Sequence, residues 1–99
     1  MVTQPMEGDT VTEARPLLKV NLATLGDVDP ASVALRLSGV GPVPTKFDPA
    51  SKNVEGRPPE ALKPGAYTAS VSAKVAGKKV ETHWNFTVAD AKGKPAAPN

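Results

Sequence analysis

Two long runs in the second half of the sequence alternate apolar and polar residues with a period of two. In residues 66–75, AYTASVSAKV, the apolar positions run from Tyr67 to Val75, and Thr, Ser and Lys occupy most of the positions between them. Residues 80–88, VETHWNFTV, repeat the pattern around Trp84 and Phe86. This period is typical of a β-strand with one buried face. Residues 76–78, AGK, separate the runs, so the sequence predicts an antiparallel hairpin.

Shorter segments with similar alternation precede this hairpin. The expected strands cover residues 10–14, 17–23, 33–38, 43–47, 52–55, 66–75 and 79–88. Eleven prolines and eight glycines punctuate the chain, which leaves little room for long helices. Pro42 and Pro44 make the segment 43–47 an expected edge strand or bulge. Seven short strands separated by regular turns predict an all-β fold, an antiparallel β-sandwich.

The apolar faces of these strands define the expected core, because two sheets with one apolar face each must stack to hide them. We expect Leu35, Val71, Tyr67, Trp84 and Phe86 to form its centre. The remaining expected core residues are Leu18, Val20, Leu22, Val33, Leu37, Phe47, Leu62, Ala69, Ala73 and Val88.

The two ends differ in composition from the middle of the chain. We expect residues 1–9 to be a flexible segment, residues 10–89 to form the domain, and residues 90–99, DAKGKPAAPN, to be a disordered linker. A linker at this position predicts neighbouring domains of the same chain, or another protein, as partners. The first ten residues contain Glu7 and Asp9 and have no apolar stretch, so we do not expect them to form a signal peptide. No apolar run approaches the roughly 20 residues of a membrane helix, and we expect no membrane insertion.

Composition argues against several kinds of chemistry. Twelve basic and ten acidic side chains give a net charge of +2, and only four residues are aromatic, so we expect no nucleic-acid binding. The chain has no cysteine, which removes disulfides, thiol catalysis and cysteine metal sites. Its single histidine excludes a metal site with several histidines inside one monomer.

Three motifs resemble bacterial immunoglobulin-like repeats. Residues 62–67, LKPGAY, are similar to the L-x-P-G-x-Y segment before a late strand of fibronectin-III and bacterial immunoglobulin-like domains. Residues 29–39, DPASVALRLSG, resemble the D-P-x-S-V-x-L-x-L-x-G stretch of bacterial immunoglobulin-like repeats. Residues 84–88, WNFTV, resemble the closing W-x-F-x-V strand of the same repeats. The resemblance implies a seven-stranded immunoglobulin-like Greek-key sandwich, in which the Tyr67 hydroxyl bonds nearby backbone as a tyrosine corner. It also implies a spacer or adhesive module of an exported bacterial protein, in the periplasm or at the cell surface.

A second resemblance concerns periplasmic copper carriers of the CopC type, which share the immunoglobulin-like fold. Those domains use an N-terminal histidine and a D-G-H turn for copper, whereas residues 76–79 here read AGKK and His83 stands alone. The same hairpin also lacks the D-x-x-G-N turn of many immunoglobulin-like repeats, and with it an acidic group near a Ca²⁺ site. Metal handling or ligand binding in the periplasm is therefore the alternative function.

Four candidate sites each have a structural alternative. His83 is expected on the solvent face beside Glu81 and Asn85, which is a poor metal site. Asp27 and Asp29 form either a weak Ca²⁺ site or ordinary turn chemistry, since aspartate caps turns. Trp84 would be a sugar-stacking platform if it were exposed, but its parity with Phe86 favours the core.

The fourth candidate is the lysine cluster at the hairpin, formed by Lys74, Lys78 and Lys79. It either meets an acidic polymer or solubilises the hairpin tip. The Asn85 sequon, N-F-T, is expected to be accidental in a strand. We therefore predict no catalytic residue, no cofactor and no metal ligand, and a monomeric, non-enzymatic module. Backbone pairing at an exposed edge strand is one way in which it could bind a partner, but the sequence does not name the strand.

Overall fold

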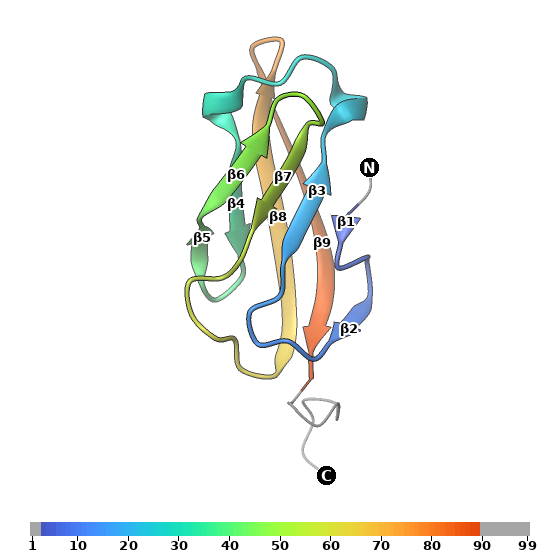
Figure 1. The fold of residues 1–99 in the computed structure, drawn as a ribbon, viewed down its shortest axis with the longest axis vertical. Helices are drawn as coiled ribbons and strands as arrows, with labels where there is room; N and C mark the ends of the chain where they lie inside the picture. The colour runs from blue at the N-terminus through green and yellow to red at the C-terminus, as the bar shows by residue number, and fades with distance from the viewer. Residues whose placement is uncertain (1–2, 90–99) are drawn as a thin grey trace.

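Two β-sheets packed face to face form the protein, as the computed structural model shows for residues 3–89 (Figure 1). The four-stranded sheet has the order β1 (Thr3–Gln4), β3 (Leu18–Asn21), β7 (Asn53–Gly56) and β6 (Thr45–Asp48). The five-stranded sheet has the order β2 (Asp9–Val11), β9 (Lys78–Val88), β8 (Gly65–Val75), β4 (Ala34–Leu37) and β5 (Gly41–Val43). Two short 3₁₀ helices, η1 (Ala23–Leu25) and η2 (Pro30–Ser32), lie between β3 and β4. The expected all-β sandwich is confirmed.

The β8–β9 hairpin is the longest element of the fold. Its register runs from Gly65 opposite Val88 to Val75 opposite Lys78, so eleven residues pair on each strand. Ala76 and Gly77 make the turn with φ angles of 51° and 80°. Positive φ at both central residues suits the twist of two paired strands. The hairpin predicted from the alternating runs is therefore confirmed.

The strand count and one strand direction differ from the sequence-based expectation. Residues 3–89 contain nine strands rather than seven. The expected strand 43–47 is divided at Pro44 into β5 and β6, which belong to different sheets. β2 runs parallel to β9, whereas all pairs were expected to be antiparallel.

The N-terminal segment supplies the other additional strand. Residues 1–9 were expected to be flexible, but Thr3 and Gln4 pair with Val20 and Lys19 of β3. Met6 and Asp9 form a turn, and Gly8 donates its N–H to the Asn85 carbonyl at 2.8 Å. This pairing was not expected from the sequence, because the backbone pairs here without an alternating side-chain pattern to reveal it. The expected linker, residues 90–99, lies outside the described residues.

The core fills the space between the two sheets. Leu35, Val71, Trp84 and Phe86 are each 2% exposed, and no polar or charged residue among the described ones is buried. Of the expected core, twelve residues are buried, while Val33, Phe47 and Tyr67 are partly buried and pack against the others. Val43, Val54 and Ala89 are also buried. They were not expected in the core, because their segments are too short to show an alternating apolar pattern.

Candidate functional site

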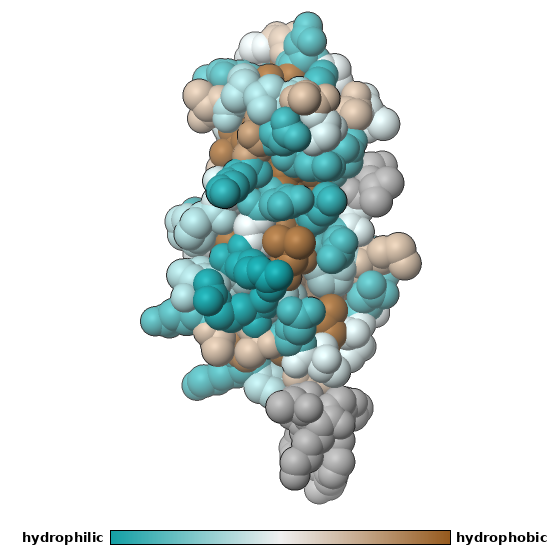
Figure 2. All heavy atoms as spheres, in the orientation of Figure 1, coloured by the Kyte–Doolittle hydropathy of each residue, from teal (hydrophilic) through white to brown (hydrophobic). Residues whose placement is uncertain are grey.

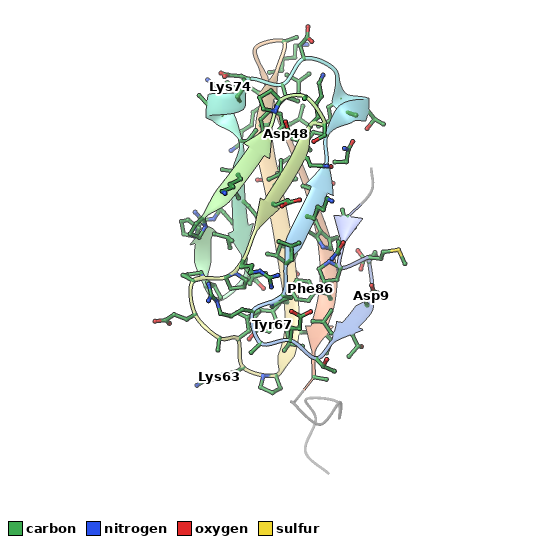
Figure 3. The ribbon with its side chains drawn as sticks, in the orientation of Figure 1. Asp9, Asp48, Lys63, Tyr67, Lys74 and Phe86 are labelled. Atoms are coloured by element: carbon green, nitrogen blue, oxygen red, sulfur yellow. The ribbon has the colours of Figure 1, made fainter. Side chains whose placement is uncertain are left out.

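Tyr67 ties one end of the sandwich together. Its hydroxyl donates to the Lys63 carbonyl at 2.6 Å, and its ring stacks on Phe86 with centroids 6.0 Å apart. Figure 3 shows the three residues near the lower end of the molecule. Bonding of a tyrosine hydroxyl to backbone just upstream is the geometry of a tyrosine corner. The role of Tyr67 in this arrangement is structural.

The candidate metal ligands do not come together. His83 is exposed on β9 opposite Ser70, and Asp27 and Asp29 are exposed in the loop before η2. The Asp29 carboxylate accepts from the Ala31 N–H at 3.1 Å and so caps η2. Across residues 3–89, no three His, Cys, Asp or Glu side chains lie close enough to share a metal ion.

Asp48 holds the turn between β6 and β7. Its carboxylate accepts hydrogen bonds from the Ser51 hydroxyl at 2.9 Å and the Ala50 N–H at 3.0 Å. These bonds, the Ser51 bond first, favour the charged form and lower the pKa of the carboxyl from its ordinary value. Asp48 is exposed near the upper end of the molecule, as is the hairpin residue Lys74 (Figure 3). Asp48 thus has a structural role in the turn.

The lysine cluster lies at the tip of the β8–β9 hairpin. Lys74 and Lys79 are directly opposite in the register, and all three lysines are exposed. Lys74 and Lys79 line an open groove with Asp29, Ser32 and Ser72. The carboxylate of Asp29 lines the same groove, so negative charge lies beside the two lysines there.

Trp84 is in the core rather than at the surface. It is 2% exposed and lies opposite Ala69 of β8. Its indole N–H has no hydrogen-bond partner within residues 3–89. A buried ring between the sheets cannot stack on a sugar from solvent, so the sugar-platform alternative does not fit this position.

The outer face of the four-stranded sheet has a row of charged residues that sequence analysis did not identify. Lys46 of β6, Glu55 of β7 and Lys19 of β3 lie side by side in the register. The Glu55 carboxylate is 3.6 Å from the Lys19 ammonium. Figure 2 shows the face over these strands as mainly hydrophilic, with small separate hydrophobic areas. Each residue is ordinary in its own segment, and only the register joins them.

A groove borders this row where β6 begins. Leu17, Pro44, Thr45 and Arg57 line it together with Lys46, Glu55 and Gly56. Arg57 is held in place there, because its guanidinium donates to the Arg15 carbonyl at 2.7 Å and lies 3.6 Å from the Glu13 carboxylate. The lining therefore combines the apolar side chains of Leu17 and Pro44 with the charged side chains of Lys46, Glu55 and Arg57.

The fold and these surfaces define a β-sandwich whose polar side chains stay on its outside. Neither protein-family models nor curated protein sequences match the chain. Among solved structures, it is similar to PcoC, a methionine-rich copper resistance protein from Escherichia coli, at 18% identity and a TM-score of 0.58. That match covers 90% of this chain and 95% of PcoC. The selenomethionine form of PcoC matches at 17% identity and a TM-score of 0.55, over 88% and 95% of the two chains. At this identity the likeness shows a shared fold.

The residues present do not fit a copper site. Copper is bound in proteins mainly by imidazole, thiolate and thioether groups. This chain has one histidine, no cysteine and two methionines. Met6 is 63% exposed, and His83 belongs to no cluster of ligands within residues 3–89. A single exposed imidazole does not make a selective copper centre.

Proposed function

We propose that the chain is a non-catalytic immunoglobulin-like binding module of a protein that works outside the cytoplasm, in the periplasm or at the cell surface. The observation that supports this proposal is that polar side chains of the module form hydrogen bonds to backbone groups in its turns and loops. Asp29 and Asp48 cap turns, and the Lys52 ammonium donates to the Gly26 carbonyl at 2.8 Å. Arg15 likewise donates to the Pro58 carbonyl at 2.8 Å. Groups engaged in this way fix turns and loops, and so stabilise a rigid body.

The fold shared with PcoC supports the β-sandwich on which the proposal is built. The motif resemblance to modules of exported proteins supports a location outside the cytoplasm. No helix within residues 3–89 is long and apolar enough to cross a membrane. We propose that the module is monomeric. Its proposed partners are neighbouring domains of the same chain, or another protein.

Cell fractionation tests this proposal. The gene product that carries this sequence is tagged at its C-terminus and followed through cytoplasmic, periplasmic and membrane fractions. We expect it outside the cytoplasm, in a complex larger than the free chain on size-exclusion chromatography. A monomeric cytoplasmic product would refute the proposal.

Copper handling is the second candidate, and the comparisons favour it because the two similar structures reported above are of a copper resistance protein. Its weakness is the donor set, which leaves His83 as the one imidazole. Titration with Cu²⁺ and Cu⁺ in competition with free histidine tests it. We expect free histidine to remove all bound copper, equally from the wild type and from His83→Ala. Retention of one copper ion per chain would establish the second candidate.

A further inference from the structure

Of the edge strands that the two sheets leave open in residues 3–89, β6 is the best suited to accept a further strand. β5 contains Pro42 and is followed by Pro44, and proline has no N–H to donate. β1 has two residues and ends before Pro5, and β2 has three residues. β6 has four residues and no proline within it, and Pro44 and Pro49 flank it. All four of its residues therefore keep a backbone N–H, and an edge of this kind is where an extended peptide can add to a sheet.

The backbone of β6 directs free hydrogen-bonding groups to its open side. The Asp48 carbonyl accepts from the Lys52 N–H at 2.6 Å, toward the turn to β7, and the Pro44 carbonyl lies against Gly56 of β7. Backbone groups alternate in direction along an antiparallel strand. The N–H and C=O groups of Thr45 and Phe47 therefore point away from β7. Within residues 3–89 they form no turn or loop hydrogen bond.

The charged row on the outer face ends at this edge with an unpaired cation. Its order from β6 inward is Lys46, Glu55 and Lys19, and the carboxylate is paired with Lys19 at 3.6 Å. Lys46 is exposed and forms no ion pair among the described residues. Opposite charges directly across strands stabilise pairing. An acidic residue next to Lys46 would therefore continue the alternation of charge by one strand.

The inner face of the same edge is apolar. Phe47 lies opposite Val54 and packs against the core, but it is only partly buried. An apolar side chain on an added strand would cover the exposed part of this ring. Since successive side chains of a strand point to opposite faces, the apolar residue and the acidic residue would be neighbours in the partner.

We propose that β6 is a docking edge for an extended segment of a partner protein, in which an acidic residue faces Lys46 and an adjacent apolar residue faces Phe47. This inference rests on the binding role proposed above and names its surface. The groove lined by Leu17, Pro44 and Arg57 receives a further side chain, two residues from the acidic one and on the same face. A second copy paired through Phe47 would place its Asp48 opposite Lys46. That carboxylate is already engaged by the Ala50 N–H and the Ser51 hydroxyl, so a free acidic residue of a different partner is favoured.

Two synthetic peptides and three variants test the inference with the full chain. The probe is a fluorescent hexapeptide of alternating valine and glutamate, and its control has lysine in place of glutamate. Thr45→Pro removes an outward N–H without removing a bond to β7, while Thr45→Val keeps that N–H and is the matched control. Lys46→Glu reverses the charge at the edge. Circular dichroism establishes that each variant is folded.

We expect the glutamate peptide to bind the wild type at least tenfold more tightly than the lysine peptide, by fluorescence anisotropy. Lys46→Glu reverses the preference, Thr45→Pro loses binding and Thr45→Val keeps it. Amide NMR shifts appear at Thr45–Asp48. Equal binding of both peptides, shifts at β5 or β1 instead, or a wild-type dimer that Thr45→Pro dissociates would each overturn the proposal.

The proposal for the docking edge and the proposed function can be refuted independently of each other. If the gene product is found outside the cytoplasm but neither peptide binds, the edge is refuted and the location of the module stands. If the product is cytoplasmic and the glutamate peptide binds as expected, the docking edge stands and the proposed function is refuted.

Discussion

Gly56 is fixed by the close approach of two strands rather than by its own φ angle. A Cβ at this position would overlap the Pro44 carbonyl oxygen and press on Val43 and Thr45 side chains. A backbone oxygen cannot move without disturbing the β6–β7 pairing. We expect Gly56→Ala to lower the free energy of unfolding by about 1–3 kcal/mol, measured by urea denaturation.

The exposed neighbour Glu55 supplies the control for Gly56. Glu55→Ala removes only a surface ion pair to Lys19, so its effect should stay below about 1 kcal/mol. Equal effects of the two substitutions would show that the close contact at Gly56 does not constrain the fold.

The Tyr67 hydroxyl can be tested apart from its ring. Tyr67→Phe removes the bond to the Lys63 carbonyl and keeps the stacking on Phe86, so we expect a loss of about 0.5–1.5 kcal/mol in unfolding free energy. Lys63→Ala is the matched control, because the acceptor is backbone and survives the substitution. Denaturant unfolding of both variants measures the difference. A larger loss in Lys63→Ala than in Tyr67→Phe would contradict the role of the hydroxyl.

At the scale of single elements, the turn of the β8–β9 hairpin contains an alanine in a conformation that alanine rarely adopts. Ala76 has a φ of 51°, and asparagine tolerates this region better. We expect Ala76→Asn to raise the unfolding free energy by about 1 kcal/mol, which is a rise of about 4–8 °C in Tm for a domain of this size. Ala76→Val should lower Tm, since β-branched residues avoid positive φ. Thermal unfolding that ranks valine above asparagine would exclude this turn geometry.

The β6–β7 turn makes a prediction about acid stability. The pKa of Asp48 is lowered in the folded state, chiefly by the Ser51 hydrogen bond, so its contribution to stability is present above the unfolded-state pKa. It is lost as the pH falls through the lower, folded-state pKa, below about pH 4. Asp48→Asn should therefore flatten the acid limb of stability against pH, with Ser51→Ala acting in the same direction. A steeper acid limb in Asp48→Asn would contradict this assignment.

The length of an element decided how well the sequence predicted it. The strands of the long hairpin were predicted because their alternation extends over many residues, and Tyr67, Trp84 and Phe86 follow from the same period. β5 and β6 were expected as one strand, because no local signal shows that the chain changes sheets at Pro44. The row from Lys46 to Lys19 depends on the register of three strands that are distant in sequence. Such a site follows from tertiary pairing, which single-segment patterns do not contain.

At the scale of the whole molecule, this chain shares the sandwich fold of PcoC but not a set of side chains suited to copper. The two PcoC structures match nearly the full length of this chain, but the match concerns the arrangement of backbone. The ligands that would hold copper are side chains, and here they are one exposed histidine and two methionines. A fold fixes where loops and edges lie, whereas function depends on what those positions present. Within residues 3–89, the open edge at β6 is one such position.

The N-terminal segment closes the opposite side of the sandwich. β1 pairs with β3 in one sheet and β2 pairs with β9 in the other, and the Ala89 N–H donates to the Val11 carbonyl at 2.8 Å. Deleting residues 1–12 would uncover the edges of β3 and β9 and expose the apolar surface under Val11. We expect a loss of about 2–4 kcal/mol in unfolding free energy and self-association, because long open edges pair with each other. Urea denaturation and sedimentation velocity measure the two effects.

Met6→Ala is the control for this deletion, because Met6 is 63% exposed and its side chain is not needed for the pairing of β1 or β2. It should remain monomeric with unchanged stability. A deletion variant that is as stable and as monomeric as the full chain would mean that the segment behaves as the flexible extension expected from its sequence. The strands β3 and β9 would then have to resist edge pairing by themselves, and the open edge at β6 would no longer be distinguished from the opposite side of the sandwich.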